Sequence, residues 1–144
     1  MVNEQGQDYA TMAAGRDMDA LIAEKVFGWR RDSVGRDADG LHGGTEVLVP
    51  PEMGDDWWRA LPLKGSVHLG HFTPRWSTDF VTAWTLVERY GRMYGNWREV
   101  AFRNELAVLV GGAWPEALYK LTPLAICRAA LASAAIGEAT GAKP

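Results

Sequence analysis

Apolar residues recur at helical spacing in two segments of the first two thirds of the chain. Between residues 17 and 29 they follow a period of three to four residues, and Gly28 offers the left-handed conformation that ends many helices. The same period predicts a second helix over residues 78–94, with Ser77 as its N-cap. The core face expected for this second helix consists of Phe80, Trp84, Val87, Tyr90 and Tyr94.

Shorter apolar runs predict strands, and breaker residues separate them. Alternating or continuous apolar residues favour strands at residues 45–49, 97–103, 106–110 and 117–120. Charged residues and glycines predict a loop over 30–44, and breakers predict an irregular segment over 52–75, in which 66–72 could form an edge strand. A last helix opens at Pro123, which follows a capping threonine, and Gly137 is expected to end it.

This order of elements favours an α+β fold, a layered sandwich in which helices flank a small, mainly antiparallel β-sheet. A chain of 144 residues is near the usual size of one domain, so we expect one hydrophobic core. The expected organisation is a flexible N-terminal segment over residues 1–13, a single domain over 14–136 and a disordered tail over 137–144.

Composition and charge narrow the classes of partner. With 47% apolar and 23% charged residues the chain is expected to fold as a globular protein. Its formal net charge of −3 provides no overall attraction to nucleic acid or to anionic lipid. The single cysteine cannot form an intrachain disulfide, and neither a signal sequence nor a long apolar span is visible. We therefore expect a cytoplasmic location, in a reducing compartment, and no membrane partner.

The residues that could carry chemistry have simpler structural explanations. His68 and His71 are three residues apart across a glycine, so on a strand they would point to opposite faces and would not hold a metal together. Cys127 lies on the apolar stripe of the last helix, where free cysteine behaves as a small hydrophobe. The hydroxyl and carboxylate groups of Ser77 and Asp79 match a helix start. No catalytic residue, metal or cofactor is expected.

Three segments occur together in an order that resembles a known family. They are AGRDMDALIAEKVFGW at 14–29, PRWSTD at 74–79 and PLAICRAAL at 123–131. This ordered set is similar to the phage αβα-sandwich domain family, and the resemblance spans residues 14–136. It implies a fold and a phage or prophage gene, and it implies no activity. The sequence departs from the family at Trp76, where a tyrosine or a similar ring is usual.

The chain contains seven tryptophans, an excess that indicates either a bulky core or an aromatic contact surface. Trp84 lies on a predicted core stripe, and Trp97 and Trp114 are assigned to packing or to sheet edges. Trp57 and Trp58 differ, because adjacent rings in an irregular segment do not easily both point inward. A covered loop and a binding surface both remain open for this pair. The candidate binding residues are Trp57, Trp58, Trp29 and Trp76.

These observations favour a non-enzymatic phage or prophage accessory protein that binds a host or phage macromolecule, with modulation of a bacterial defence system as one role. A protein partner is favoured over nucleic acid because the chain is acidic. The alternative is a protein that sequesters or cleaves a small ligand, such as a nucleotide, in an aromatic pocket between helix and sheet. The sequence does not specify the oligomeric state.

Overall fold

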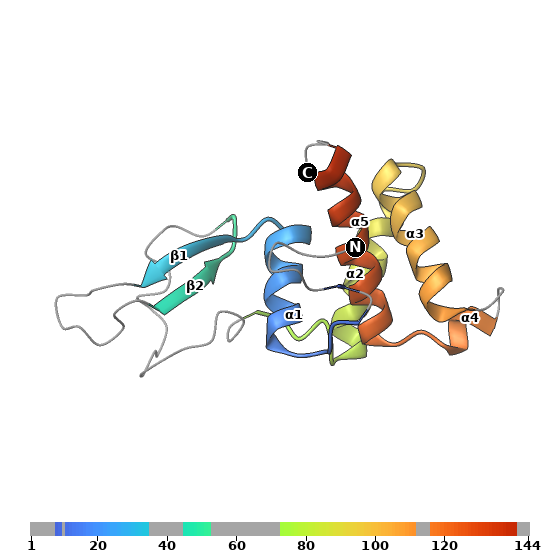
Figure 1. Ribbon diagram of the computed structural model, residues 1–144, viewed down its shortest axis with the longest axis horizontal. Coiled ribbons are helices and arrows are strands. Elements are labelled where there is room, and N and C mark those ends of the chain that lie inside the picture. The colour runs from blue at the N-terminus through green and yellow to red at the C-terminus, as the bar shows by residue number, and fades with distance from the viewer. Residues whose placement is uncertain (1–7, 10, 35–44, 53–72, 112–115, 141–144) are drawn as a thin grey trace.

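The computed structural model describes residues 8–9, 11–34, 45–52, 73–111 and 116–140 (Figure 1). In chain order the elements are α1 (Arg16–Leu21), the π-helical turn η1 (Ile22–Val26), β1 (Arg30–Val34), β2 (Thr45–Val49), α2 (Phe80–Gly91), α3 (Trp97–Val110), α4 (Glu116–Tyr119) and α5 (Pro123–Thr140). The predicted α+β class is confirmed: the fold is mainly helical and has a small two-stranded antiparallel sheet. Within the described ranges, no helix has the length and apolar character needed to cross a membrane.

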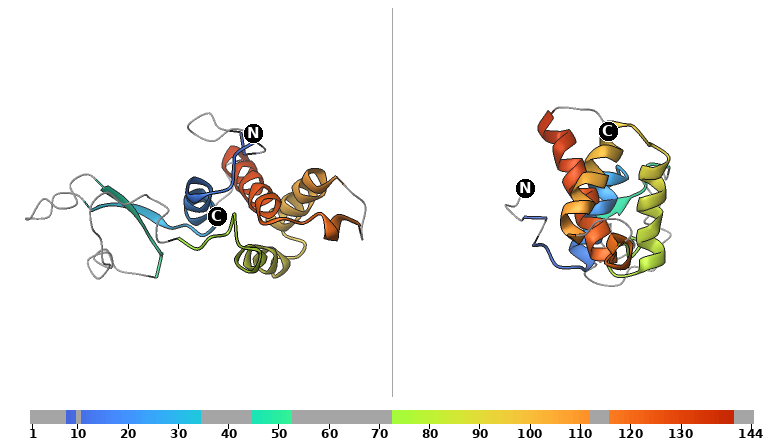
Figure 2. Two further views of the ribbon diagram at one scale, coloured as in Figure 1. Left: turned by 90° about the horizontal axis from the view of Figure 1, so that it is seen from below. Right: turned by 90° about the vertical axis from the view of Figure 1, so that its right-hand side faces the viewer.

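Helix α5 lies at the centre of the helical part and packs against η1, α2 and α3. Figures 1 and 2 show the two strands at one end of the molecule, beyond α1, and α3 on the opposite side of α5. The predicted helix at Pro123 is confirmed, because the Thr122 hydroxyl accepts a hydrogen bond from Ala125 N–H (3.1 Å) at its start. Buried side chains cover most of the circumference of α5, as expected for a helix surrounded by others.

The hydrophobic core joins the first helical segment to α2 and α5. Its largest fully buried apolar side chains are Met18, Ile22, Leu86, Ile126, Leu131 and Val49. The predicted burial of Cys127 is confirmed, because the residue is completely inaccessible within this core. Aromatic packing adds to it at Tyr90 and Phe102, whose rings stack with centroids 4.2 Å apart.

The sheet pairs a predicted strand with one that the sequence does not reveal. Strand β2 is confirmed at Thr45–Val49, but the loop expected over 30–44 is wrong at its start, where β1 forms. The pairing is antiparallel, with Arg30 opposite Val49 and Val34 opposite Thr45. Among the described residues the sheet consists of these two strands, so each is an edge there, and an edge strand tolerates charged residues. The pairing with β2 therefore gives this polar segment its extended form. The expected edge strand at 66–72 lies outside the described residues.

Helix α3 replaces two predicted strands. Residues 97–103 and 106–110 were expected to form two strands, but they belong to one continuous helix. The Asn96 side chain accepts a hydrogen bond from Arg98 N–H (3.0 Å) at its start, and Gly111 ends it in the left-handed conformation at φ +62°. Both ends of the helix are therefore capped by residue types that favour those positions.

The C-terminal part also differs from the prediction. The strand expected at 117–120 is wrong, because the helical turn α4 covers most of it. Gly137 does not end α5, which continues to Thr140, so the disordered tail expected over 137–144 is wrong for its first four residues. The Trp97 ring lies against Gly137, and a Cβ there would be only 2.5 Å from the Cη2 atom. This glycine therefore provides space for a ring and does not terminate the helix.

The N-terminal segment contributes to the core. Residues 1–13 were expected to be flexible, yet Tyr9 and Met12 are buried in the core. The Arg128 guanidinium donates two hydrogen bonds to the Met12 carbonyl, from Nε at 3.2 Å and from Nη2 at 2.8 Å. This part of the segment is thus fixed to α5 by both apolar contact and hydrogen bonding.

The second predicted helix is confirmed as α2, with a different cap and a different core face. Asp79, not Ser77, is the N-cap, and its carboxylate accepts a hydrogen bond from Val81 N–H (3.3 Å). Phe80, Trp84 and Tyr94 were expected in the core but are 45%, 37% and 78% exposed. The residues that α2 buries are Ala83, Leu86 and Tyr90.

Candidate ligand-binding pocket

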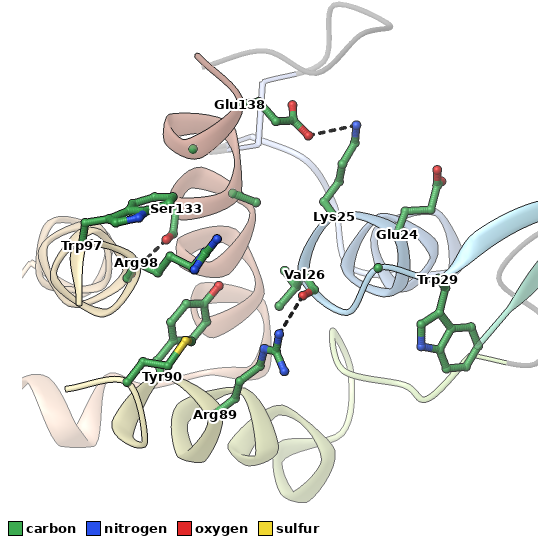
Figure 3. A pocket seen from close by; sticks show the side chains of 14 residues that line it. Glu24, Lys25, Val26, Trp29, Arg89, Tyr90, Trp97, Arg98, Ser133 and Glu138 are labelled. Carbon is green, nitrogen blue, oxygen red and sulfur yellow. Dashed lines mark hydrogen bonds and ion pairs between the residues drawn. The ribbon is translucent and has the colours of Figure 1, made fainter. Parts of the chain in front are cut away.

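A pocket of about 320 Å³ opens between the end of η1 and helices α2, α3 and α5 (Figure 3). Four separate elements thus contribute side chains to one hollow. The lining includes Glu24, Lys25, Val26 and Trp29 from the first segment, Arg89 and Tyr90 from α2, Trp97 and Arg98 from α3, and Ser133, Gly137 and Glu138 from α5.

The π-helical turn shapes one wall of the pocket. Phe27 N–H donates to the Ile22 carbonyl at 3.2 Å, five residues back, which widens the helix where it ends. The Val26 carbonyl lies in the last turn, where helical carbonyls lack partners within the helix. Arg89 Nη2 donates a hydrogen bond to it at 3.2 Å, and the same guanidinium lies 4.9 Å from the Phe27 ring centroid. Arg89 thereby links α2 to this wall.

The first turn of α3 forms the opposite wall. The Arg98 guanidinium stacks over the Trp97 ring with 4.8 Å between the guanidinium carbon and the ring centroid. The Ser133 hydroxyl donates a hydrogen bond to the Arg98 carbonyl at 3.0 Å, which ties this turn to α5. Because Gly137 lacks a side chain, the Trp97 ring can lie directly on α5. The stacked pair therefore has a defined position in the pocket.

Tyr90 provides a buried hydroxyl between these walls. The residue is 4% exposed, and burial raises the pKa of its hydroxyl, against the opposing effects of the Ser133 hydroxyl and the nearby charges of Arg89 and Arg98. The hydroxyl therefore remains protonated at neutral pH and can donate a hydrogen bond. Figure 3 shows Tyr90 pointing toward α5, with its ring between Arg98 and Arg89.

The lining carries an excess of positive charge. It includes three cationic side chains, Lys25, Arg89 and Arg98, and two carboxylates, Glu24 and Glu138, so its net charge is +1 in a chain of net charge −3. Both carboxylates are paired: Glu138 with Lys25 at 3.1 Å, and Glu24 with an arginine of β1 at 2.6 Å. A pocket with this lining favours an anion.

The predicted binding residues do not come together in one site. Trp57 and Trp58 lie outside the described residues. Trp29 lines the pocket. Trp76 is 4% exposed, stacked on Phe27 at 4.9 Å between ring centroids and edge-on to Trp29 at 6.4 Å. Its ring is enclosed by these neighbours, so the prediction of Trp76 as a binding residue is wrong and the ring serves packing.

Sequence reasoning missed Trp97, Arg98 and Arg89. Trp97 was assigned to packing or to a sheet edge, because the segment that follows it was interpreted as a strand. The cap at Asn96 was the signal that could have placed Trp97 and Arg98 together in a first helical turn. Arg89 had no comparable signal, since its role depends on the carbonyl of Val26, 63 residues earlier.

A second polar cluster joins α1 to the turn before α2 and is closed to solvent. The Asp19 carboxylate is 1% exposed and accepts a hydrogen bond from Ser77 N–H at 2.8 Å. The Ser77 hydroxyl accepts from Gly15 N–H at 2.9 Å and donates to the Gly15 carbonyl at 3.2 Å. Burial raises the pKa of Asp19, while the Ser77 hydrogen bonds and two nearby arginines act in the opposite direction. The Ser77 and Asp19 groups therefore serve the fold.

The remaining candidates for chemistry give no site in the described part of the chain. Burial, and secondarily the charge of Asp19, raises the pKa of the Cys127 thiol, so it stays protonated and is a poor nucleophile. Among the described residues no group of three or more histidine, cysteine, aspartate or glutamate side chains could hold a metal ion. His68 and His71 lie outside those residues.

The fold and the pocket together define a small α+β protein with a locally cationic, partly aromatic cavity. No family model, no curated protein and no solved structure matches the chain. The resemblance to the phage αβα-sandwich family therefore stays a prediction.

Proposed function

We propose that this protein binds and holds a small anionic ligand with an aromatic ring, of the nucleotide type, in the pocket between η1, α2, α3 and α5. The observation that carries the proposal is the convergence of Arg89, Arg98 and the Tyr90 hydroxyl on one hollow with the Trp97 ring in one wall. This develops the nucleotide alternative drawn from the sequence, at a different location, between helices.

Each part of the lining matches one part of such a ligand. A guanidinium presents paired N–H donors that fit phosphate oxygens. Stacking on the Trp97 ring fixes the orientation of the Arg98 guanidinium. The Trp97 ring is 38% exposed, and stacking of an aromatic base on such a ring contributes about 1–3 kcal/mol in other proteins. The volume of about 320 Å³ is at the lower end of the range of small-molecule sites, which suits one compact ligand.

We propose retention of the ligand and not its turnover. The described lining provides cations, aromatic side chains and the protonated Tyr90 hydroxyl, which bind and orient an anion. Its two carboxylates are each engaged by a cation, at 3.1 Å for Glu138 and 2.6 Å for Glu24. A carboxylate whose oxygens are engaged by a cation is less available to accept a proton from a ligand.

A calorimetric titration with adenosine, inorganic phosphate and AMP tests this proposal. We expect AMP to bind and to raise the melting temperature, and adenosine and phosphate to bind more weakly, because each contacts only part of the pocket. Arg98→Gln should weaken AMP binding about tenfold or more, which corresponds to one lost charge-assisted contact. Absence of AMP binding to the wild-type protein would refute the proposal.

Arg92→Gln is the matched control for this titration. Arg92 follows α2 directly, its side chain is 81% exposed, and it pairs with Glu88 at 3.9 Å outside the pocket. The substitution removes the same charge from the chain as Arg98→Gln does. Equal losses of AMP affinity in both variants would attribute the effect to overall charge and not to the pocket.

A second candidate function is binding of a host or phage protein, and one surface feature favours it. Phe80, Val81 and Trp84 are exposed at the start of α2, and the rings of Phe80 and Trp84 stack with 6.0 Å between centroids. Exposed tryptophans are frequent anchors at protein interfaces. Affinity capture with the wild type and with Trp84→Ala tests this: a protein retained only by the wild type, at unchanged melting temperature, would support it.

A further inference from the structure

One ion pair spans two elements of the pocket. Lys25 Nζ, from η1, lies 3.1 Å from Glu138 Oε1, from the last turns of α5. Figure 3 shows this pair at one side of the pocket, with the guanidinium groups of Arg89 and Arg98 at the other side. The three cations of the lining are thus divided between two positions.

The two partners of this ion pair differ in burial. The Lys25 side chain is 20% exposed and the Glu138 side chain is 53% exposed. A mostly buried ammonium group depends on a nearby negative charge, since it has lost much of its hydration. A half-exposed carboxylate, in contrast, regains water when it leaves. Glu138 is therefore the partner that can be exchanged at low cost.

The position of Glu138 on its helix also favours exchange. It lies two residues before the end of α5, where the helix dipole disfavours a negative side chain. A partly exposed ion pair contributes only about 0–1 kcal/mol. An anion that approaches Lys25 from the pocket thus competes with a weakly held carboxylate.

We infer that the pocket takes a ligand with two anionic groups, such as a nucleoside diphosphate, and that Glu138 is a built-in competitor for the second group. The first group contacts Arg89 and Arg98, and the second replaces Glu138 at Lys25. This inference rests on the proposed function, and it narrows the ligand class by assigning a role to each of the three cations. It also makes Glu138 a determinant of specificity, because a ligand with one anionic group leaves the ion pair intact.

Calorimetric titration with AMP and ADP tests the inference. We expect wild-type protein to bind ADP more tightly than AMP. Glu138→Gln should tighten ADP binding about three- to fivefold, because the second phosphate of ADP then no longer has to displace a carboxylate from Lys25. The same substitution should tighten AMP binding less than ADP binding, because the single phosphate of AMP occupies the first anion position and does not displace Glu138. Lys25→Gln should abolish the preference for ADP over AMP, both as a single substitution and in combination with Glu138→Gln.

Glu88→Gln is the matched control. Its carboxylate has the same exposure as that of Glu138, 53%, and pairs with an arginine at 3.9 Å, but Glu88 is not part of the pocket lining. It should leave both affinities unchanged. A melting curve of each variant shows whether it is folded.

The possible failures are distinguishable. If wild-type protein binds both nucleotides and Glu138→Gln leaves their affinity ratio unchanged, the inference is wrong and the proposed function stands. If Lys25→Gln weakens AMP and ADP equally, Lys25 contacts the first anionic group and the inference is again wrong. If AMP does not bind the wild type, the proposed function fails and the inference fails with it.

Discussion

Two polar regions of this molecule use similar groups in opposite ways. The cluster of Asp19 and Ser77 joins α1 to the turn before α2, and its carboxylate is 1% exposed. The pocket instead collects Lys25, Arg89 and Arg98 around a hollow of about 320 Å³. The first region directs its polar atoms at the backbone of the protein, and the second directs its charges at a space that a ligand can enter.

The difference explains which region serves stability and which serves binding. A buried carboxylate that accepts a backbone N–H gains its stabilisation within the chain, and removing it leaves that donor without a partner. Cations around an accessible cavity retain part of their hydration, so they contribute little to folding and remain able to bind an anion. Substitutions in the two regions should therefore separate stability from binding.

The largest expected effect on stability is that of Asp19→Ala. It should lower the free energy of unfolding by about 2–3 kcal/mol, since the buried Ser77 N–H loses its acceptor. Urea denaturation measures this change. The AMP affinity of the folded protein should be unaffected because Asp19 does not line the pocket. A loss below 0.5 kcal/mol, or a parallel loss of AMP affinity, would contradict the division between the regions.

Gly137→Ala should have the next largest effect, and it acts on the pocket wall. The added Cβ would lie 2.5 Å from Trp97 Cη2, so the ring must move, at a cost of about 1–2 kcal/mol. Denaturant unfolding followed by tryptophan fluorescence would detect both the instability and the moved ring. AMP affinity should fall with it, because Arg98 is stacked on that ring.

Gly91→Ala serves as the control for this substitution. Gly91 is the last residue of α2, and no atom lies within 4 Å of a Cβ added there. Alanine is a better helix former than glycine, so stability should stay constant or rise by up to about 1 kcal/mol. A similar loss in both variants would show that the cost at Gly137 is not due to the Trp97 ring.

Asp19→Asn should have a smaller effect, and one that depends on pH. Burial raises the pKa of Asp19 above its usual 3.8, so the folded protein binds this proton more tightly than the unfolded chain does. The contribution of Asp19 to stability is therefore full below pH 3.8 and declines as pH rises through the raised pKa. Asparagine removes this decline. The stability of the variant relative to wild type should increase from pH 3 to pH 7. A decrease would contradict a raised pKa of Asp19 in the folded protein.

The smallest expected effect on stability is that of Arg98→Gln. Its guanidinium faces the pocket and the Trp97 ring, so its removal should change the free energy of unfolding by less than about 1 kcal/mol. Of these substitutions, Arg98→Gln should have the largest effect on AMP affinity. A stability loss equal to that of Asp19→Ala would instead place Arg98 in the structural framework.

The sequence by itself determined the α+β class, three helical segments and strand β2. Local signals were sufficient in each case: the apolar period before Gly28, the proline start of α5, and the burial of Cys127 on an apolar stripe. These signals lie within one or two turns of the residues that they specify. For α3 such signals also existed, because Glu99 pairs with Arg103 at 3.0 Å one turn later, but the alternation of Val100 and Phe102 was given more weight.

Tertiary structure alone decided the core face of α2, the extended form of β1 and the assembly of the pocket. Phe80 and Trp84 share helical spacing with core residues, and only the position of α5 selects the face with Ala83, Leu86 and Tyr90. Likewise, Gly137 has the local character of a helix end, but the Trp97 ring on α5 makes it a packing position. The cations of the pocket are separated along the chain by up to 73 residues, from Lys25 to Arg98, and no local pattern encodes their convergence, because it depends on how three helices and a π-helical turn pack.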